Sequence, residues 1–397
     1  MLVQFKMKNV LSFKEETIFD MTAISAYKEH VSNLIDIDKK EKFLRVAAIY
    51  GANASGKSNF VCAMRFFQRI IVESLNNVDD GAESILEKYS MPFSFEDKME
   101  NSEFEIVEII DNEEYQYGFE YNSESIVMEW LYKKNLDTNR KVTIFERTTQ
   151  EVNLGASVRK ECEAYKDQIP SETLVLSFFN KLKLKTDIYK KVYTGIMDIL
   201  VLSSDACENT GVLNAILPQI IDNEKEELLE FLAAIDTGIK NISYDENEKE
   251  IIFYTFHKGA DGEMYPLNLY NESEGTIKSI MLFIYAKTAI YKDGMIVIDE
   301  LNVKLHPLLL KFIIDLFYNN DSKAQLIYTT HDTTLMDKKF FRRDQIWFVQ
   351  KDDLGHSELC ALSDFKVRSD ASFEKDYLSG VYGGIPFLKD FSLKAGE

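Results

Sequence analysis

Apolar residues recur at helical spacing in several segments of the chain. Between residues 60 and 71 they fall three and four positions apart, which predicts an amphipathic helix that buries one face. The same periodicity predicts helices at 172–179, 188–202, 224–235 and 277–290. No heptad pattern persists between 150 and 240, so any insertion there is expected to be compact and not a long coiled coil.

Other segments carry the patterns of strands. Strict alternation from Tyr115 to Tyr121 predicts a half-exposed strand, and its continuation predicts an antiparallel meander across 104–146 with an aromatic stripe in the core. Short strands are predicted at 2–8, 17–21 and 250–256, and uninterrupted apolar runs predict buried strands at 44–50, 295–298 and 325–329. Buried strands that alternate with helices predict an α/β fold with a mainly parallel sheet.

The segment between the strand at 44–50 and the helix that follows fits the phosphate-binding pattern G-x-x-x-x-G-K-[ST]. Its glycines let backbone N–H groups turn towards a phosphate, and the helix N-terminus adds a positive end. Lys57 is expected to reach the β- and γ-phosphates of ATP, and Ser58 to bind Mg²⁺. The alternative is a glycine- and serine-rich turn that matches by chance. The predicted nucleotide-binding residues are Gly51, Asn53, Ala54, Ser55, Gly56, Lys57, Ser58 and Asn59.

Two carboxylates end the buried strand at 295–298. Asp299 is expected to hold Mg²⁺ opposite Ser58, and Glu300 to polarise the water that attacks ATP. An ordinary buried strand that meets an acidic turn is the alternative. The strand at 325–329 delivers His331 at its carboxyl end, where open α/β sheets bind ligands, although a lone histidine there can be structural. Ser273 and Gly275, at the start of the helix at 277–290, form a second anion site or merely an N-cap.

Charge and cysteine content narrow the class of protein. The 397 residues include 66 acidic and 46 basic side chains, a net charge of −20, which argues against non-specific coating of nucleic acid. The net charge leaves a local basic groove as an alternative. Its candidates are the basic runs at 181–185 and 338–343, although a solvated helix face is favoured for both. Four scattered cysteines predict neither a zinc site nor a disulfide framework. With no signal peptide and no apolar run long enough to span a bilayer, a cytoplasmic protein without membrane contact is expected.

The order of these motifs resembles that of ABC-type ATPases of the SMC/RecF group. The segments 51–59 and 298–307 resemble those of the short, stand-alone RloA/AbiL-like ATPases of bacterial restriction and abortive-infection loci. The segments 345–349 and 377–386 are similar to the C-terminal part of that group. The resemblance implies a P-loop NTPase head with an antiparallel β meander and a compact helical insertion. It divides the chain into an N-terminal ATPase lobe (1–150), a mostly helical insertion (151–265) and a C-terminal ATPase lobe (266–397).

The resemblance also implies roles. Asp299 matches the Walker B aspartate, Glu300 the catalytic glutamate and His331 the switch histidine. Ser273 and Gly275 match the signature motif, which caps the ATP held by the other subunit of a homodimer. The sequence departs from the family pattern at Glu272, where an apolar residue is usual, and at Asn302, where aspartate is usual; the glutamine of a Q-loop is not placed.

These observations predict an ATPase that uses ATP and Mg²⁺, dimerises around ATP and controls a protein effector, a nuclease or toxin, in anti-phage defence. One alternative is a RecF-like DNA-repair clamp, which the acidic composition and the missing coiled-coil arms disfavour. A second is a fused nuclease, but the stretch after His331 is short and has no Asp-x-Asp pair. A nucleotide-binding regulator that does not hydrolyse ATP is the third, and Glu300 disfavours it.

Overall fold

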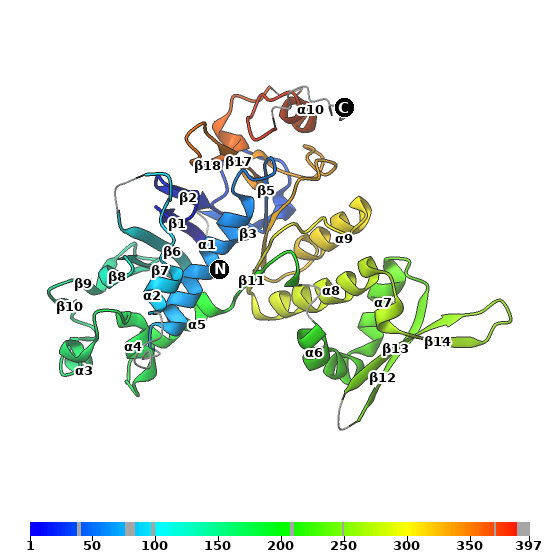
Figure 1. Ribbon diagram of the computed structural model, residues 1–397, viewed down its shortest axis with the longest axis horizontal. Coiled ribbons are helices and arrows are strands. Elements are labelled where there is room, and N and C mark those ends of the chain that lie inside the picture. The colour runs from blue at the N-terminus through cyan, green and yellow to red at the C-terminus, as the bar shows by residue number, and fades with distance from the viewer. Residues whose placement is uncertain are drawn as a thin grey trace, which may run out of the picture.

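The computed structural model describes residues 1–37, 41–75, 84–96, 100–206, 210–247, 250–368 and 371–386. They form an α/β fold around two large sheets. The seven-stranded sheet lies at one side of the molecule, and a smaller sheet with helices α6 and α7 lies at the opposite end (Figure 1). None of the helices in these residues has the length and apolar content needed to span a bilayer.

The predicted antiparallel meander is confirmed as part of the seven-stranded sheet. The strand order is β10-β9-β8-β7-β6-β1-β2, and every neighbouring pair is antiparallel. Its aromatic stripe, from Tyr115 to Tyr121, is at most 1% exposed and belongs to the core, as predicted. The strands are β1 (Leu2–Lys8), β2 (Thr17–Asp20), β6 (Ser102–Ile110), β7 (Glu113–Tyr121), β8 (Ile126–Asn135), β9 (Lys141–Thr148) and β10 (Val152–Leu154).

The six-stranded sheet contains the three predicted buried strands. Its order is β11-β15-β16-β5-β17-β18, and all neighbours are parallel except β17 and β18. Side chains of β5 alternate between two hydrophobic cores, so both faces of the sheet are covered. The strands are β5 (Val46–Tyr50), β11 (Ile199–Leu202), β15 (Met295–Ile298), β16 (Gln325–Thr329), β17 (Ile346–Lys351) and β18 (Ser357–Ala361).

Helices cover the two faces of this sheet. One core is shared with the seven-stranded sheet and holds α1 (Lys57–Glu73), α2 (Ile85–Tyr89), α3 (Arg159–Cys162), α4 (Val175–Lys181) and α5 (Ile188–Met197). The other core holds α6 (Thr210–Asn223), α7 (Lys225–Ala234), α8 (Glu274–Lys292), α9 (Pro307–Tyr318) and α10 (Phe373–Leu378). The apolar face predicted at 60–71 is the buried face of α1.

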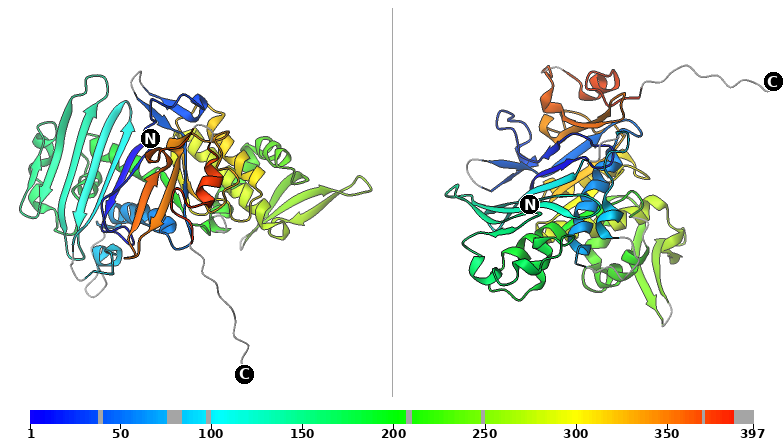
Figure 2. Two further views of the ribbon diagram at one scale, coloured as in Figure 1. Left: turned by 90° about the horizontal axis from the view of Figure 1, so that it is seen from above. Right: turned by 60° about the vertical axis from the view of Figure 1, so that its left-hand side comes forward.

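The region 151–265 is less helical than predicted. The segment 188–202, predicted as one helix, ends as a helix at Met197 and continues as strand β11, which pairs in parallel with β15. A short apolar run suits a buried helix or a buried strand equally, and the sheet edge decides here. The region also includes a separate antiparallel sheet, whose β13–β14 hairpin projects from the body (Figure 2). The remaining strands are β12 (Ile239–Glu246), β13 (Ile251–Lys258), β14 (Met264–Asn268), and the pair β3 (Leu34–Asp36) and β4 (Lys42–Leu44).

Candidate functional site

The loop between β5 and α1 depends on its two glycines. Gly56, the N-cap of α1, has φ +119°, a conformation that L side chains rarely adopt. A Cβ atom there would lie 2.4 Å from Ser357 Oγ, and a Cβ atom on Gly51 would lie 2.5 Å from Val349 O. Both positions therefore bring the loop backbone against β17 and β18 more closely than a side chain allows.

Lys57 lies across this loop. Its Nζ donates hydrogen bonds to the carbonyl oxygens of Gly51 at 2.7 Å and Ala52 at 3.0 Å. Burial lowers the pKa of Lys57, whereas Glu300 and Asp299 raise it. The lysine and the two carboxylates therefore act on one another across the site, although 242 residues separate Lys57 from Asp299 in the sequence.

Two serines outside the motif hold the loop in place. Ser357 Oγ donates to Ser55 O at 2.6 Å and lies 2.7 Å from Ser12 Oγ. Asn59 Nδ2 donates to the same Ser12 Oγ at 2.7 Å. These serines were not in the predicted set, because contacts between the first loop and β18 have no signal in a local sequence pattern.

The remaining groups of the loop fit a phosphate. The side chains of Asn53, Ala54 and Ser58 are exposed. Ser55 Oγ is buried and has no hydrogen-bond partner among the described residues. With the N-terminus of the 17-residue helix α1 beside them, these groups offer N–H and O–H donors in the arrangement that binds anions.

The two carboxylates after β15 are fixed by the neighbouring strand. Asp299 is 7% exposed, and its Oδ1 accepts a hydrogen bond from Thr329 Oγ1. The same hydroxyl accepts from the Glu300 N–H at 2.8 Å. On the other side, Asp299 N–H donates to Leu202 O at 3.0 Å. Glu300 is half-buried and has φ +48°, so its backbone is strained and is stabilised by these surroundings.

His331 and Asn302 meet at the same edge of the sheet. His331 is exposed, and its Nε2 lies 3.4 Å from Asn302 Nδ2. Asn302 Oδ1 accepts from Thr330 Oγ1 at 2.8 Å. Asn302 therefore ties the loop after β15 to the end of β16.

The start of α8 packs on the loop after β15. Ser273 is exposed and is the N-cap, with its Oγ accepting from Thr276 N–H at 3.1 Å. A Cβ atom on Gly275 would lie 2.8 Å from Lys304 O, so the helix start packs closely on the loop after β15. Within the described part of the chain, no hydrogen bond or ion pair joins Ser273 or Gly275 to the phosphate-binding loop.

Glu272, which departs from the family pattern, has partners of its own. Its Oε1 accepts a hydrogen bond from Thr255 Oγ1 and lies 2.6 Å from His257 Nε2, both on β13. The carboxylate therefore anchors the segment before α8 to the three-stranded sheet.

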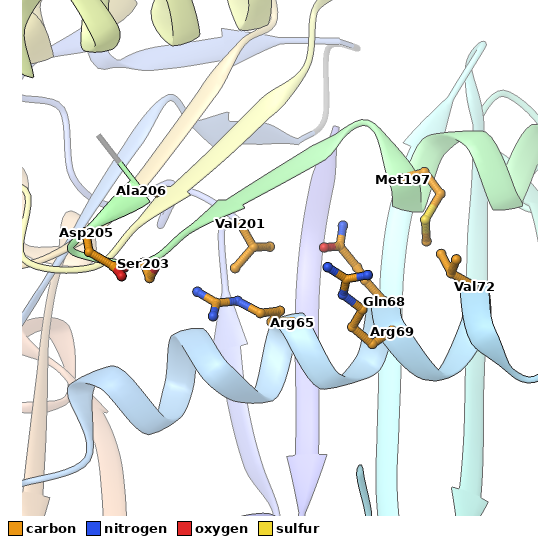
Figure 3. Close-up of a pocket in the computed structure, with 9 residues that line it drawn as sticks. All are labelled: Arg65, Gln68, Arg69, Val72, Met197, Val201, Ser203, Asp205 and Ala206. Atoms are coloured by element: carbon orange, nitrogen blue, oxygen red, sulfur yellow. The ribbon is translucent and has the colours of Figure 1, made fainter. Parts of the chain in front are cut away.

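A groove of about 730 Å³ lies beside α1, between that helix and β11 (Figure 3). Gln68, one of its lining residues, donates through Nε2 to Ile196 O at 2.7 Å and Ile199 O at 2.8 Å. The side chain of Arg65 extends along it towards Asp205 (Figure 3). A hydrogen bond from Ser203 holds the pKa of Asp205 below its usual value, and Arg65 adds to this effect. These residues were missed because β11 was predicted as helix.

The basic run at 338–343 contributes Lys339 to a pocket of about 290 Å³, which His30 and Lys311 also line. Arg342 is 1% exposed, pairs with Asp344 at 2.7 Å and donates to backbone carbonyls of residues 24–29. It therefore holds the fold together. The lysines at 181–185 are exposed, as a solvated surface requires. Within the described residues, no group of three or more His, Cys, Asp or Glu side chains could hold a metal ion, and Cys62, Cys162 and Cys360 are free.

The fold and the phosphate-binding loop define a P-loop NTPase. More specifically, the chain belongs to the family described as "AAA domain, putative AbiEii toxin, Type IV TA system", which matches residues 46–156 and 207–337. Membership of an ATPase family implies nucleotide binding. A comparison with curated proteins found no match.

Solved structures of SMC heads are similar to this chain at low identity. One is an SMC head bound to the C-terminal winged-helix domain of ScpA, with 14% identity and a TM-score of 0.43 over 94% of this chain and 99% of that one. Another is the SMC head domain from Thermotoga maritima, with 15% identity and a TM-score of 0.42 over 91% of this chain and 98% of that one.

Proposed function

We propose that this protein hydrolyses ATP between the phosphate-binding loop and the Asp299–Glu300 pair. The observation that supports this most directly is that the phosphate-binding loop and the Asp299–Glu300 pair follow two parallel strands, β5 and β15, which are separated by β16 alone and so end at the same edge of the sheet. A cation for the phosphates and a carboxylate for the attacking water are the two charges that phosphoryl transfer to water requires.

Ser58 and Asp299 are the residues that would hold Mg²⁺, a hydroxyl and a carboxylate, which are ligands this ion takes beside phosphate oxygens. When bound, the ion neutralises charge that develops on the phosphates. Ser58 is exposed at the start of α1, and Asp299 is oriented by the hydroxyl of Thr329.

Glu300 acts as the general base in this proposal. Its backbone N–H donates to Thr329 Oγ1, and its φ is +48°. The side chain of Glu300 would therefore point in a different direction from that of Asp299. A base so placed contributes about 10²–10⁴ in rate. His331, which lies next to Asn302, would respond to the γ-phosphate in this proposal.

We further propose that ATP joins two chains head to head. Ser273 is exposed at a helix N-terminus, a position where hydroxyl and N–H groups bind anions. In a two-fold dimer the Ser273 and Gly275 of each chain would meet the ATP of its partner, and both sites would be completed at once.

The ATPase cycle would then serve as a switch for a protein effector, a nuclease or toxin, in anti-phage defence. The family description, which names a toxin and a toxin–antitoxin system, supports this role, as does the resemblance to RloA/AbiL-like ATPases. A partner captured from the native host by the Glu300→Gln protein with ATP, but not by the Lys57→Ala protein, would identify that effector.

The test of the chemistry is turnover and nucleotide affinity for purified variants. Glu300→Gln should bind ATP and lose hydrolysis by about 10²-fold or more, whereas Lys57→Ala should weaken binding itself. Glu263→Gln, an exposed carboxylate in the β13–β14 hairpin, is the matched control. Near-normal turnover of Glu300→Gln would refute the assignment.

A further inference from the structure

The order of strands fixes the direction in which a bound nucleotide extends. Asp299 and Glu300 follow β15, and the phosphate-binding loop follows β5. On the far side of β5 lie β17, parallel to β5, and then β18. A nucleotide whose γ-phosphate faces β15 therefore directs its nucleoside towards the β17–β18 turn, which lies at the same edge of the sheet.

An aromatic cluster packs against that turn. The ring centroids of Phe93 and His356 are 4.6 Å apart at an interplanar angle of 69°, and those of Phe93 and Phe95 are 5.4 Å apart at 80°. Phe95 is 71% exposed, and Leu354, in the turn itself, is 69% exposed. Phe95 packs against Phe93 and exposes most of its ring to solvent, so the exposed part of the ring does not contribute to the hydrophobic core.

The cluster is joined rigidly to the phosphate-binding loop. His356 is next to Ser357, whose N–H donates to Ser12 O at 2.7 Å and whose hydroxyl contacts Ser55 O. Gly355, with φ +90°, brings its Cα so close to Phe95 that a Cβ atom would lie 2.8 Å from the ring.

Polar neighbours orient the histidine. His356 Nδ1 lies 3.1 Å from Asp352 Oδ2, and its Nε2 lies 3.7 Å from Glu96 Oε1. The imidazole is therefore held between two carboxylates with its side chain only 17% exposed. It supports the phenylalanines and is not free to turn away.

We propose that Phe95, supported by Phe93 and His356, is the platform on which the base of the bound nucleotide stacks. The inference rests on the proposed function, because it takes the triphosphate to lie in the Gly51–Ser58 loop. Stacking on an aromatic face suits any nucleobase, since each has a π face. Phe95 therefore contributes to affinity for the whole nucleotide and not for the phosphates alone.

The experiment compares two ligands that differ in the nucleoside. ATP and inorganic tripolyphosphate are titrated into the wild-type chain, Phe95→Ala, Phe95→Trp and the control Tyr291→Ala, which removes an aromatic side chain that is 90% exposed on α8. Phe95→Ala should weaken ATP binding about tenfold and leave tripolyphosphate binding unchanged, and Phe95→Trp should restore ATP binding. Photolabelling with 8-azido-ATP should modify the peptide that contains Phe95 or the one that contains His356.

Other results would overturn either the Phe95 platform or the proposed function. Equal ATP affinity of Phe95→Ala and wild type, or an equal loss for both ligands, would overturn the platform. Photolabelling confined to other peptides would do the same. If wild-type protein bound no ATP, or bound it without need of Lys57, the proposed function would fail first. ATP binding that depends on Lys57 but not on Phe95 would remove this inference alone.

Discussion

Thr329 Oγ1 donates a 2.5 Å hydrogen bond to Asp299 Oδ1, and it accepts the N–H of Glu300. One hydroxyl on β16 thus fixes the side chain of one carboxylate and the backbone of the next. Because Asp299 is buried, the loss of this bond would cost about 1.5–3 kcal/mol, the range for hydrogen bonds to charged groups.

We therefore expect Thr329→Val to lower kcat by about 10- to 100-fold while the KM for ATP changes little. Valine keeps the shape of threonine, so the loss would come from the hydroxyl. Thr288→Val, which removes a hydroxyl bonded to Ile284 O on α8, is the control and should keep wild-type turnover. Steady-state kinetics decide, and an unchanged kcat for Thr329→Val would show that the hydroxyl does not position the carboxylates.

Lys278 links α8 to the loop after β15. Its side chain is 5% exposed, and its Nζ lies 2.8 Å from Val303 O and 3.5 Å from Glu300 O. Lys278→Met should lower kcat about tenfold with little effect on nucleotide affinity, since it loosens the backbone of Glu300 and leaves the phosphate-binding loop intact. Lys287→Met, on the same helix but paired with Glu224, should retain normal turnover. A loss confined to affinity would contradict this positioning role.

The proposed dimer can be tested by complementation. Lys57→Ala chains lack a competent phosphate-binding loop but keep Ser273, whereas Ser273→Arg chains have the opposite defect. Each variant should be nearly inactive alone. An equal mixture should recover up to about a quarter of wild-type ATPase activity, because half of the dimers are mixed and each has one intact site. Full activity of Ser273→Arg alone, with a monomer by light scattering in ATP, would rule out the dimer.

Glu108 predicts a pH dependence of stability. Burial raises its pKa to about 7, an effect that the Met1 ammonium opposes and Asp198 reinforces. In an unfolded chain glutamate titrates near 4.3, so between these values the folded state retains a proton that the unfolded state has lost. The stabilisation is full below about pH 4 and is lost as pH rises past 7, a change of about 4 kcal/mol.

Glu108→Gln should therefore lose less stability than wild type between pH 5 and pH 8. The difference between the two proteins isolates this group from Glu129, whose pKa is also raised to about 7 by burial. Urea unfolding at both pH values measures it, with exposed Glu124→Gln as the control. Parallel pH profiles for wild type and Glu108→Gln would contradict the assignment.

The sequence predicted those parts of the site that are local in the chain. The loop from Gly51 to Ser58 and the apolar run before Asp299 are short patterns that depend on neighbours in sequence, and both lie where their flanking elements were predicted. Residues that act through distant contacts were not predictable. Ser12 and Ser357 are ordinary serines until the fold brings them to the same loop, and Lys278 is one more helical lysine until its amine reaches two carbonyls.

The misplaced elements have a similar explanation. The apolar run Ile199–Leu202 could equally have ended the preceding helix, and its pairing with β15 makes it a strand. The three-stranded sheet between α7 and α8 was missed in part because β12 and β14 are half-exposed strands of mixed composition. In both cases tertiary pairing overrides the local pattern.

The contact between Ser357 and Ser12 also bears on how the protein is made. During synthesis the whole Gly51–Ser58 loop leaves the ribosome about 300 residues before the serine that supports it. A nascent chain would thus contain the loop without Ser357 to hydrogen-bond to it. Contacts between residues so far apart in the sequence form slowly during folding. The ability to bind a nucleotide would therefore arise late in synthesis, and a prematurely terminated chain would not bind a nucleotide in this loop.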